Sequence, residues 1–218
     1  MDVSIFQIVV VLILLFFFIY NKHKKRKEFI ASFQFPVAIK QRVNAKYPHL
    51  SNDQVELVLD ALKSFFIISY KAKLKPVAMP SQVVDVAWHE FILFTKNYEI
   101  FCKKGIGRFL HHTPTEAMKS PTNAQEGIKR AWRLACDLEN INPASPARLP
   151  LLFAIDAKLK IEDGFFYSKN CKDKSSPTYG QDYCATHIGC SSGCSGSSGD
   201  SSTSCGSSCG SSCGGGGD

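Results

Sequence analysis

No charged residue occurs between Val3 and Tyr20, and only Ser4 and Gln7 interrupt this stretch with polar groups. A core helix of a soluble protein seldom lacks a polar face, so this absence argues against a buried soluble helix. At helical rise the 18 residues span roughly 27 Å, close to the hydrocarbon thickness of about 30 Å in a bilayer. Because a helix satisfies its own backbone hydrogen bonds in lipid, the sequence predicts a transmembrane anchor over residues 1–21.

The flanks of this stretch lack the features of a cleaved signal peptide. Met1 and Asp2 precede it where a signal peptide has positive charge, and Asn21 followed by Lys22 replaces a small-residue cleavage site. Lys and Arg residues are kept on the cytoplasmic side of membranes, and here they all follow the apolar stretch. We therefore expect an uncleaved single-pass protein of the cell membrane, with the N-terminus outside and the C-terminal body in the cytoplasm.

The positive charge of the chain is concentrated in one place. Of the net charge of +7, five positive charges belong to the juxtamembrane run Lys22, Lys24, Lys25, Arg26 and Lys27, which leaves +2 for the remainder. The chain has no basic stripe interleaved with aromatic residues and no nucleic-acid motif, so we expect no nucleic-acid partner. We expect residues 22–35 to form a basic linker that fixes topology and attracts anionic lipid headgroups near Lys22–Lys27, at about 1 kcal/mol per Lys or Arg.

Sustained alternation of apolar and polar residues is absent after residue 28, which argues against a β-sheet. Apolar residues recur at helical spacing instead. Ser51 and Gln54 form a capping-box pattern at one helix start. Ser81 caps a second, long helix that is expected to run to about Lys103 and to stop near Gly105.

Three more helices complete the expected body. They cover Pro36–Lys46, a segment that begins near Asn123, and about Pro150 to Ile161. The sequence thus predicts an all-α protein: an N-terminal transmembrane helix, a compact bundle of about five helices over residues 36–165, and a disordered tail over residues 166–218.

The helix that starts at Ser81 carries the candidate site. Asp85 and His89 are one turn apart and can contact each other, and His111 and His112 follow the helix. Two interpretations are open. In one, Asp85, His89 and one or both of His111 and His112 converge on a divalent metal such as zinc, because imidazole and carboxylate suit zinc or iron. In the other, Asp85 only orients His89, and the histidine pair caps the end of the helix.

Neighbouring residues limit the chemistry of this helix. Leu93 stands where a zincin motif starting at His89-Glu90 would have its second histidine. Glu90 is the acid/base candidate of an enzyme, yet at 100° per residue it points well away from His89. Cys102 lies about 220° round the helix from His89, so a straight helix cannot aim both at one ion. We expect Cys102 and Cys136 to be buried small hydrophobes.

The run Asp85-x-x-Trp88-His89-x-x-x-Leu93-x-x-x-x-Tyr98-x-x-x-Cys102 resembles the helix signature of the glycine-rich-domain-containing-protein-like family, formerly a domain of unknown function. In plant members Trp-His is followed by Thr-His, and Glu90 and Phe91 replace that pair here, so no role of the second histidine carries over. The chain is more similar to bacterial-type members, including the His-His pair before a proline. The resemblance covers about residues 36–160, implies a helical domain and supplies no catalytic activity.

Seven of the nine cysteines lie after residue 170, and no large apolar residue follows Ile188. Such a segment cannot bury a core, so we expect it to be disordered. Two interpretations of its cysteines are open: capture of Zn(II) or Cu(I) by free thiols in a reducing cytosol, or a low-complexity extension without such chemistry. The candidate tail ligands are Cys190, Cys194, Cys205, Cys209 and Cys213.

The favoured function is that of a membrane-tethered binding or scaffold protein, whose helical body docks a protein partner and whose tail is a flexible arm. No catalytic residue is assigned, and whether the protein is an enzyme is left open. The alternatives are a metal-dependent enzyme that uses Asp85, His89, His111 and His112, and a metal-buffering protein that acts through the tail.

Overall fold

A computed structural model of the chain describes residues 3–112, 121–169 and 183–184. In this part seven α-helices occur: α1 (Val3–Ser32), α2 (Val37–Lys46), α3 (Asn52–Lys71), α4 (Gln82–Ile92), α5 (Thr95–Phe101), α6 (Pro121–Leu138) and α7 (Leu151–Leu159). A π-helical turn, η1 (Cys102–Ile106), follows α5 directly. The predicted all-α class is confirmed.

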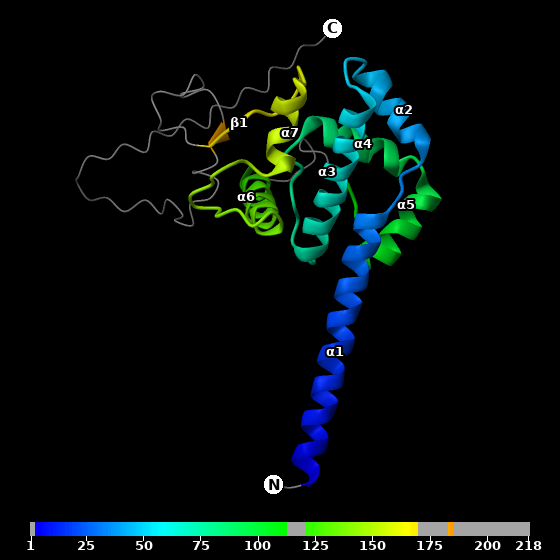
Figure 1. The fold of residues 1–218 in the computed structure, drawn as a ribbon, viewed down its shortest axis with the longest axis vertical. Helices are drawn as coiled ribbons and strands as arrows, with labels where there is room; N and C mark the ends of the chain where they lie inside the picture. The colour runs from blue at the N-terminus through cyan, green and yellow to red at the C-terminus, as the bar shows by residue number, and fades with distance from the viewer. Residues whose placement is uncertain (1–2, 113–120, 170–182, 185–218) are drawn as a thin grey trace, which may run out of the picture.

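The first helix projects from the body as a long rod (Figure 1). Its segment Phe6–Ser32 is long and apolar enough to cross a membrane, and none of its most apolar 18-residue window is buried inside the protein. Large side chains from Phe6 to Tyr20 are exposed, as expected of a segment that anchors in lipid. A signal sequence near an N-terminus passes the same test of length and composition.

The juxtamembrane residues, expected as a linker, are helical as far as Ser32. Lys and Glu are good helix formers, and Lys24 and Glu28 pair one turn apart at 3.9 Å. The last turns of α1 also belong to the body, since Ile30 is fully buried. A side chain at Gly105 of η1 would meet Ile30 Cγ1 at 2.9 Å, so the glycine permits the close approach of the two helices.

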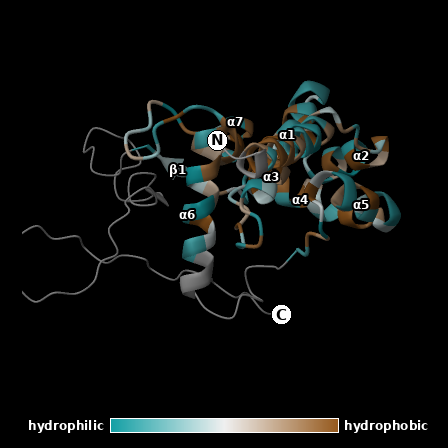
Figure 2. Ribbon diagram, turned by 90° about the horizontal axis from the view of Figure 1, so that it is seen from below, coloured by the Kyte–Doolittle hydropathy of each residue, from teal (hydrophilic) through white to brown (hydrophobic). Residues whose placement is uncertain are grey.

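The core lies where α3 packs against its neighbours, and the hydrophobic residues of α3, α4 and α5 gather there (Figure 2). Aromatic rings fill much of it: Phe66 contacts Trp88, Phe91 and Phe101, with ring centroids 4.7–6.2 Å apart. Phe65 adds a contact to Trp88 at 4.9 Å. The capping box at Ser51 is present in both halves, as the sequence predicts.

The long helix expected from Ser81 to about Lys103 is divided in two, and that expectation was wrong. The chain leaves α4 after Ile92 and starts α5 at Thr95. In one straight helix Phe91 and Phe101 would be about 15 Å apart along the axis. The break brings their ring centroids to 5.3 Å, so apolar packing in the core outweighs the continuous backbone hydrogen bonding of a longer helix.

A short strand pair lies beyond the helices, where no sheet was expected. β1 (Tyr167–Ser168) and β2 (Tyr183–Cys184) pair in parallel, with Tyr167 opposite Tyr183. The ring of Tyr167 packs on Phe153 of α7 at 4.9 Å, so the body continues past the expected boundary at residue 165. The predictions for the cysteines of the tail fall on residues 185–218, which lie outside the described residues.

Candidate metal centre

Two segments position the candidate ligands. Asp85 and His89 stand one turn apart on α4, whose start is capped by the Ser81 hydroxyl, which accepts a hydrogen bond from Val84 N at 3.3 Å. His112 arrives from the segment that follows η1. That segment is fixed by Leu110, whose carbonyl accepts a hydrogen bond from the buried Tyr98 hydroxyl. Secondary structure thus supplies one pair of candidate ligands, and the chain after η1 supplies the third.

The donor atoms of these three side chains converge. His112 Nε2 lies 2.9 Å from Asp85 Oδ1 and 3.1 Å from His89 Nε2, and His89 Nε2 lies 3.6 Å from Asp85 Oδ2. One ligand atom from each residue lies within 4.8 Å of the other two. Tetrahedral ligands at about 2.1 Å from zinc are roughly 3.4 Å apart, so the three side chains lie close enough together to share a single ion.

The burial of the three residues is graded. The side chain of His112 is 13% exposed and that of Asp85 is 23% exposed, whereas that of His89 is 50% exposed. The Trp88 ring packs against His112 at 4.4 Å and walls the inner side. A metal held here would therefore face protein on one side and solvent on the other. An open fourth position is the arrangement in which zinc binds a water or an external ligand.

Two other candidate residues, His111 and Glu90, lie outside the cluster. His111 is exposed, and its ring packs on Phe109 at 4.8 Å, away from the cluster. Adjacent residues in an extended segment point to opposite sides, which is why only His112 faces Asp85. Glu90 is not part of the cluster either. Its carboxylate accepts a hydrogen bond from Arg42 Nη1 at 2.8 Å.

The cysteines near the body are not ligands in this geometry. Cys102 and Cys136 are free and buried, as the sequence predicts. Burial raises the pKa of the Cys102 thiol above its ordinary value and that of Cys136 to about 11, so both stay protonated at neutral pH. The candidate tail ligands Cys190, Cys194, Cys205, Cys209 and Cys213 lie outside the described residues.

Sequence reasoning missed a buried carboxylate that positions α4. Asp156 on α7 is 1% exposed, and its oxygens accept hydrogen bonds from Gln82 N at 2.7 Å and Val83 N at 3.3 Å. These are N–H groups of the first turn of α4, which have no partner within the helix. The available signal was a lone acidic residue within the apolar stretch Leu151–Leu159.

The chain is thus a helical protein with one long apolar helix and a cluster of one carboxylate and two histidines. A family model described as UCP032817-like matches residues 25–188, which is well over half of the chain, and the chain belongs to this uncharacterized family. The match includes the three clustered residues and leaves out the apolar part of α1. No curated protein and no solved structure matches the chain.

Proposed function

We propose that this protein is a single-pass membrane protein whose helical body binds one divalent metal ion, such as zinc, through Asp85, His89 and His112. The observation that carries the proposal is the convergence of the three donor atoms, with His112 Nε2 at 2.9 Å from one ligand atom and 3.1 Å from the other. Two imidazoles and a carboxylate are a common ligand set for zinc with an open position.

The proposal favours metal binding, as part of a binding or scaffold role, over hydrolytic chemistry. A metal-activated water needs a general base within hydrogen-bond reach, about 2.6–3.2 Å. Glu90, the nearest candidate in the sequence, is paired with Arg42 on another side of α4. A bound metal with an open position would instead accept a ligand from a docked protein partner. A metal-dependent enzyme remains the alternative, and it would need a base from the partner or the substrate.

The membrane arrangement is part of the same proposal. The apolar segment before Tyr20 would span the bilayer, and the Lys and Arg residues that follow it favour a cytoplasmic body and an outside N-terminus. The run Lys22–Lys27 would lie against anionic lipid headgroups. Protease added to intact cells should leave the C-terminus uncut, and cleavage there would contradict this orientation.

A relationship to glycine-rich-domain-containing proteins of bacterial type is also proposed. It is supported by the spacing of Asp85, Trp88 and His89 with Tyr98 and Cys102. In this chain Trp88 Nε1 donates a hydrogen bond to the Tyr98 hydroxyl at 3.1 Å, so the motif links α4 to α5 beside the cluster. The tail cysteines would provide a second, independent place for metal capture.

The test measures zinc bound to the full chain in detergent under reducing conditions, after removal of metal with a chelator. Every protein tested carries serine in place of the five candidate tail ligands, so that these thiols do not compete for zinc. The replaced residues are Cys190, Cys194, Cys205, Cys209 and Cys213. One zinc per chain is expected in calorimetry and elemental analysis. His89→Ala and His112→Ala should each weaken binding at least about 100-fold, since even partners outside the ligand shell change affinity by 10–100-fold.

The matched control is His111→Ala, which removes the adjacent residue of the same type. It should bind zinc as the unsubstituted chain does, because His111 packs on Phe109 outside the cluster. The proposed centre is wrong if the His112→Ala and His111→Ala variants bind zinc equally well.

A further inference from the structure

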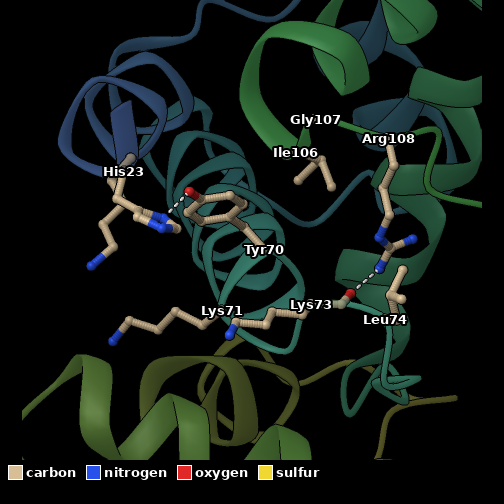
Figure 3. Close-up of a pocket in the computed structure, with 9 residues that line it drawn as sticks. His23, Tyr70, Lys71, Lys73, Leu74, Ile106, Gly107 and Arg108 are labelled. Carbon is tan, nitrogen blue, oxygen red and sulfur yellow. Dashed lines mark hydrogen bonds between the residues drawn. The ribbon is translucent and has the colours of Figure 1, made fainter. Parts of the chain in front are cut away.

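A cationic groove lies at the end of the body from which α1 projects. Figure 3 shows it between α1, the C-terminal end of α3, and η1 with the residues that follow. Its volume is about 540 Å³. The side chains of His23 and Tyr70 are hydrogen bonded across it, which ties α1 to α3 at this level. The groove is thus formed by three segments that are far apart in the sequence.

The groove is lined by positive charge without an acidic residue. Lys27 of α1, Lys71 and Lys73 at the end of α3, and Arg108 after η1 all line it, and no Asp or Glu is among its lining residues. One of these cations is paired: the Asp137 carboxylate accepts a hydrogen bond from Lys71 Nζ at 2.7 Å. The hydrogen bond and charge of Lys71, with a smaller contribution from Lys27, hold the pKa of Asp137 below its ordinary value.

Two of these cations are left available for a ligand. Lys27 and Lys73 are exposed, and their ammonium groups have no ion pair within the described residues. Arg108 donates to the Lys73 carbonyl at 2.5 Å, which fixes the loop and keeps its guanidinium at the groove. The remaining lining includes apolar groups, from Tyr70, Leu74 and Ile106. A cationic rim over an apolar wall suits an amphiphile with an anionic head.

The position of the groove along α1 sets its depth relative to a membrane. His23 and Lys27 follow Tyr20 by three and seven residues, which is about 4.5 Å and 10.5 Å along a helix. The headgroup layer beyond the hydrocarbon is roughly 5–8 Å thick. The groove therefore opens within and just above the headgroups. Leu74, which lines the groove, is 85% exposed, as an apolar side chain would be if it met lipid.

We infer that this groove binds the phosphate headgroup of an anionic phospholipid, taken from the leaflet next to the basic end of α1. The phosphate is held by Lys27 and Lys73, and the glycerol and first methylenes lie on Tyr70 and Leu74. Basic pockets at the ends of membrane helices recognise anionic headgroups in this way. The inference rests on the membrane anchoring in the proposed function and not on the metal centre. It names a built site on three segments, rather than diffuse attraction to a run of lysines.

The test uses the full chain in neutral detergent, with short-chain phosphatidylglycerol as the anionic lipid and phosphatidylcholine as the zwitterionic one. Binding is followed by native mass spectrometry and by titration calorimetry. One phosphatidylglycerol per chain is expected, bound more tightly than phosphatidylcholine. The double variant Lys27→Gln/Lys73→Gln should bind it about 30-fold more weakly, from two lysine contacts at the usual strength.

The matched control is Lys25→Gln/Lys75→Gln. It removes the same charge from the same two segments, two residues away in each, and neither residue lines the groove. It should bind phosphatidylglycerol within about threefold of the unsubstituted chain. All four lysines are exposed, so both double variants are expected to fold, and equal thermal melting temperatures verify this. Equal weakening in the two double variants would overturn the inference in favour of diffuse charge attraction.

A second arm separates the sources of phosphate. Inorganic phosphate and glycerol phosphate are titrated as competitors, and each should compete at least tenfold less well than the lipid, because neither contacts the apolar wall. Equal competition would overturn the lipid assignment in favour of a soluble phosphate compound. Zinc content should be unchanged in both double variants, and carbonate extraction of membranes tests anchoring separately. The experiments therefore test lipid binding in the groove separately from the proposed metal centre and from the proposed membrane anchor.

Discussion

Ser81 Oγ donates a hydrogen bond to Asp156 Oδ1 at 2.7 Å, and this buried contact joins the start of α4 to α7. The same Ser81 oxygen accepts from Val84 N, so one hydroxyl serves both the cap of α4 and the link to α7. The second oxygen of Asp156 accepts from Gln82 N and from Phe165 N, at 2.7 and 2.9 Å. This carboxylate thereby fixes the helix that presents Asp85 and His89.

Replacing the buried carboxylate should destabilise the protein strongly. In Asp156→Ala, Ser81 Oγ and the N–H groups of Gln82 and Phe165 lose their acceptor, and unpaired buried donors are costly. We expect a loss of about 3 kcal/mol in the free energy of unfolding, and a fall of roughly 6–12 °C in Tm. Thermal unfolding of the full chain in detergent, followed by circular dichroism, measures it.

The control for this prediction is Glu162→Ala, which removes an exposed acidic residue close to Asp156 in the sequence. Its Tm should stay within about 2 °C of the unsubstituted chain, as for most surface substitutions. If both variants melted alike, the hydrogen bonds to Asp156 would not be the stabilising feature described above.

A second prediction concerns the glycine that lies against the same carboxylate. A Cβ at Gly164 would meet Asp156 Cβ at 2.7 Å and the Ile161 backbone oxygen at 2.9 Å, and neither atom is the end of a flexible side chain. Gly164→Ala should therefore cost about 1–3 kcal/mol by overpacking. Gly107→Ala is the comparison, because its Cβ would meet only the mobile end of Arg26, and its φ of +86° adds about 1 kcal/mol. Urea titrations measure the free energy of unfolding of both variants. A smaller loss in Gly164→Ala than in Gly107→Ala would contradict the close packing of Gly164 against Asp156.

A third prediction concerns the buried thiols. Burial raises the pKa of Cys136 to about 11 and also raises that of Cys102, and the thiolate is the reactive form. Iodoacetamide at pH 8 should therefore leave both unlabelled in the folded chain and label both in guanidinium. Peptide mass spectrometry separates them from the tail cysteines. Labelling of Cys136 in the native protein would contradict its burial.

The same thiol gives the sign of the alkaline pH dependence. The unfolded thiol titrates near 9 and the folded Cys136 near 11, so above about pH 9 the unfolded state binds fewer protons. The contribution of Cys136 to the free energy of unfolding should be fully present below pH 9 and should fall as the pH rises toward 11. Burial raises the pKa values of Tyr47 and Tyr98 in the same direction. Melting curves at pH 8 and pH 10.5 show the effect, and Cys136→Ser, which does not titrate, should reduce it.

A fifth prediction uses Trp88 as a reporter of the metal centre. Its ring lies 4.4 Å from His112, so a paramagnetic Co(II) ion bound by Asp85, His89 and His112 should quench its fluorescence. The quenching should saturate at one equivalent and disappear in His112→Ala. In Trp88→Phe, Co(II) should change the fluorescence of the remaining Trp132 little, because Trp132 packs on Phe153 of α7. Equal quenching in the two tryptophan backgrounds would place the ion elsewhere.

The local features of the body could be read from the sequence. The caps at Ser51 and Ser81, the helices Val37–Lys46 and Leu151–Leu159, and the contact between Asp85 and His89 all follow from residues within one or two turns. Short-range hydrogen bonding and helical periodicity determine such features, because they need no distant partner. The charge-free stretch before Tyr20 likewise determined the long apolar helix.

Only the tertiary structure decided the rest. The break after Ile92 arises because Phe91 and Phe101 pack on each other and on Phe66 of α3, a gain that no local pattern records. His112, and not His111, joins Asp85 because the chain after η1 is held by the Tyr98 hydroxyl on Leu110. The cationic groove likewise needs α1, α3 and η1 side by side, since no one segment holds its charges. Long-range packing sets these features, because apolar burial and buried hydrogen bonds depend on which segments meet in space.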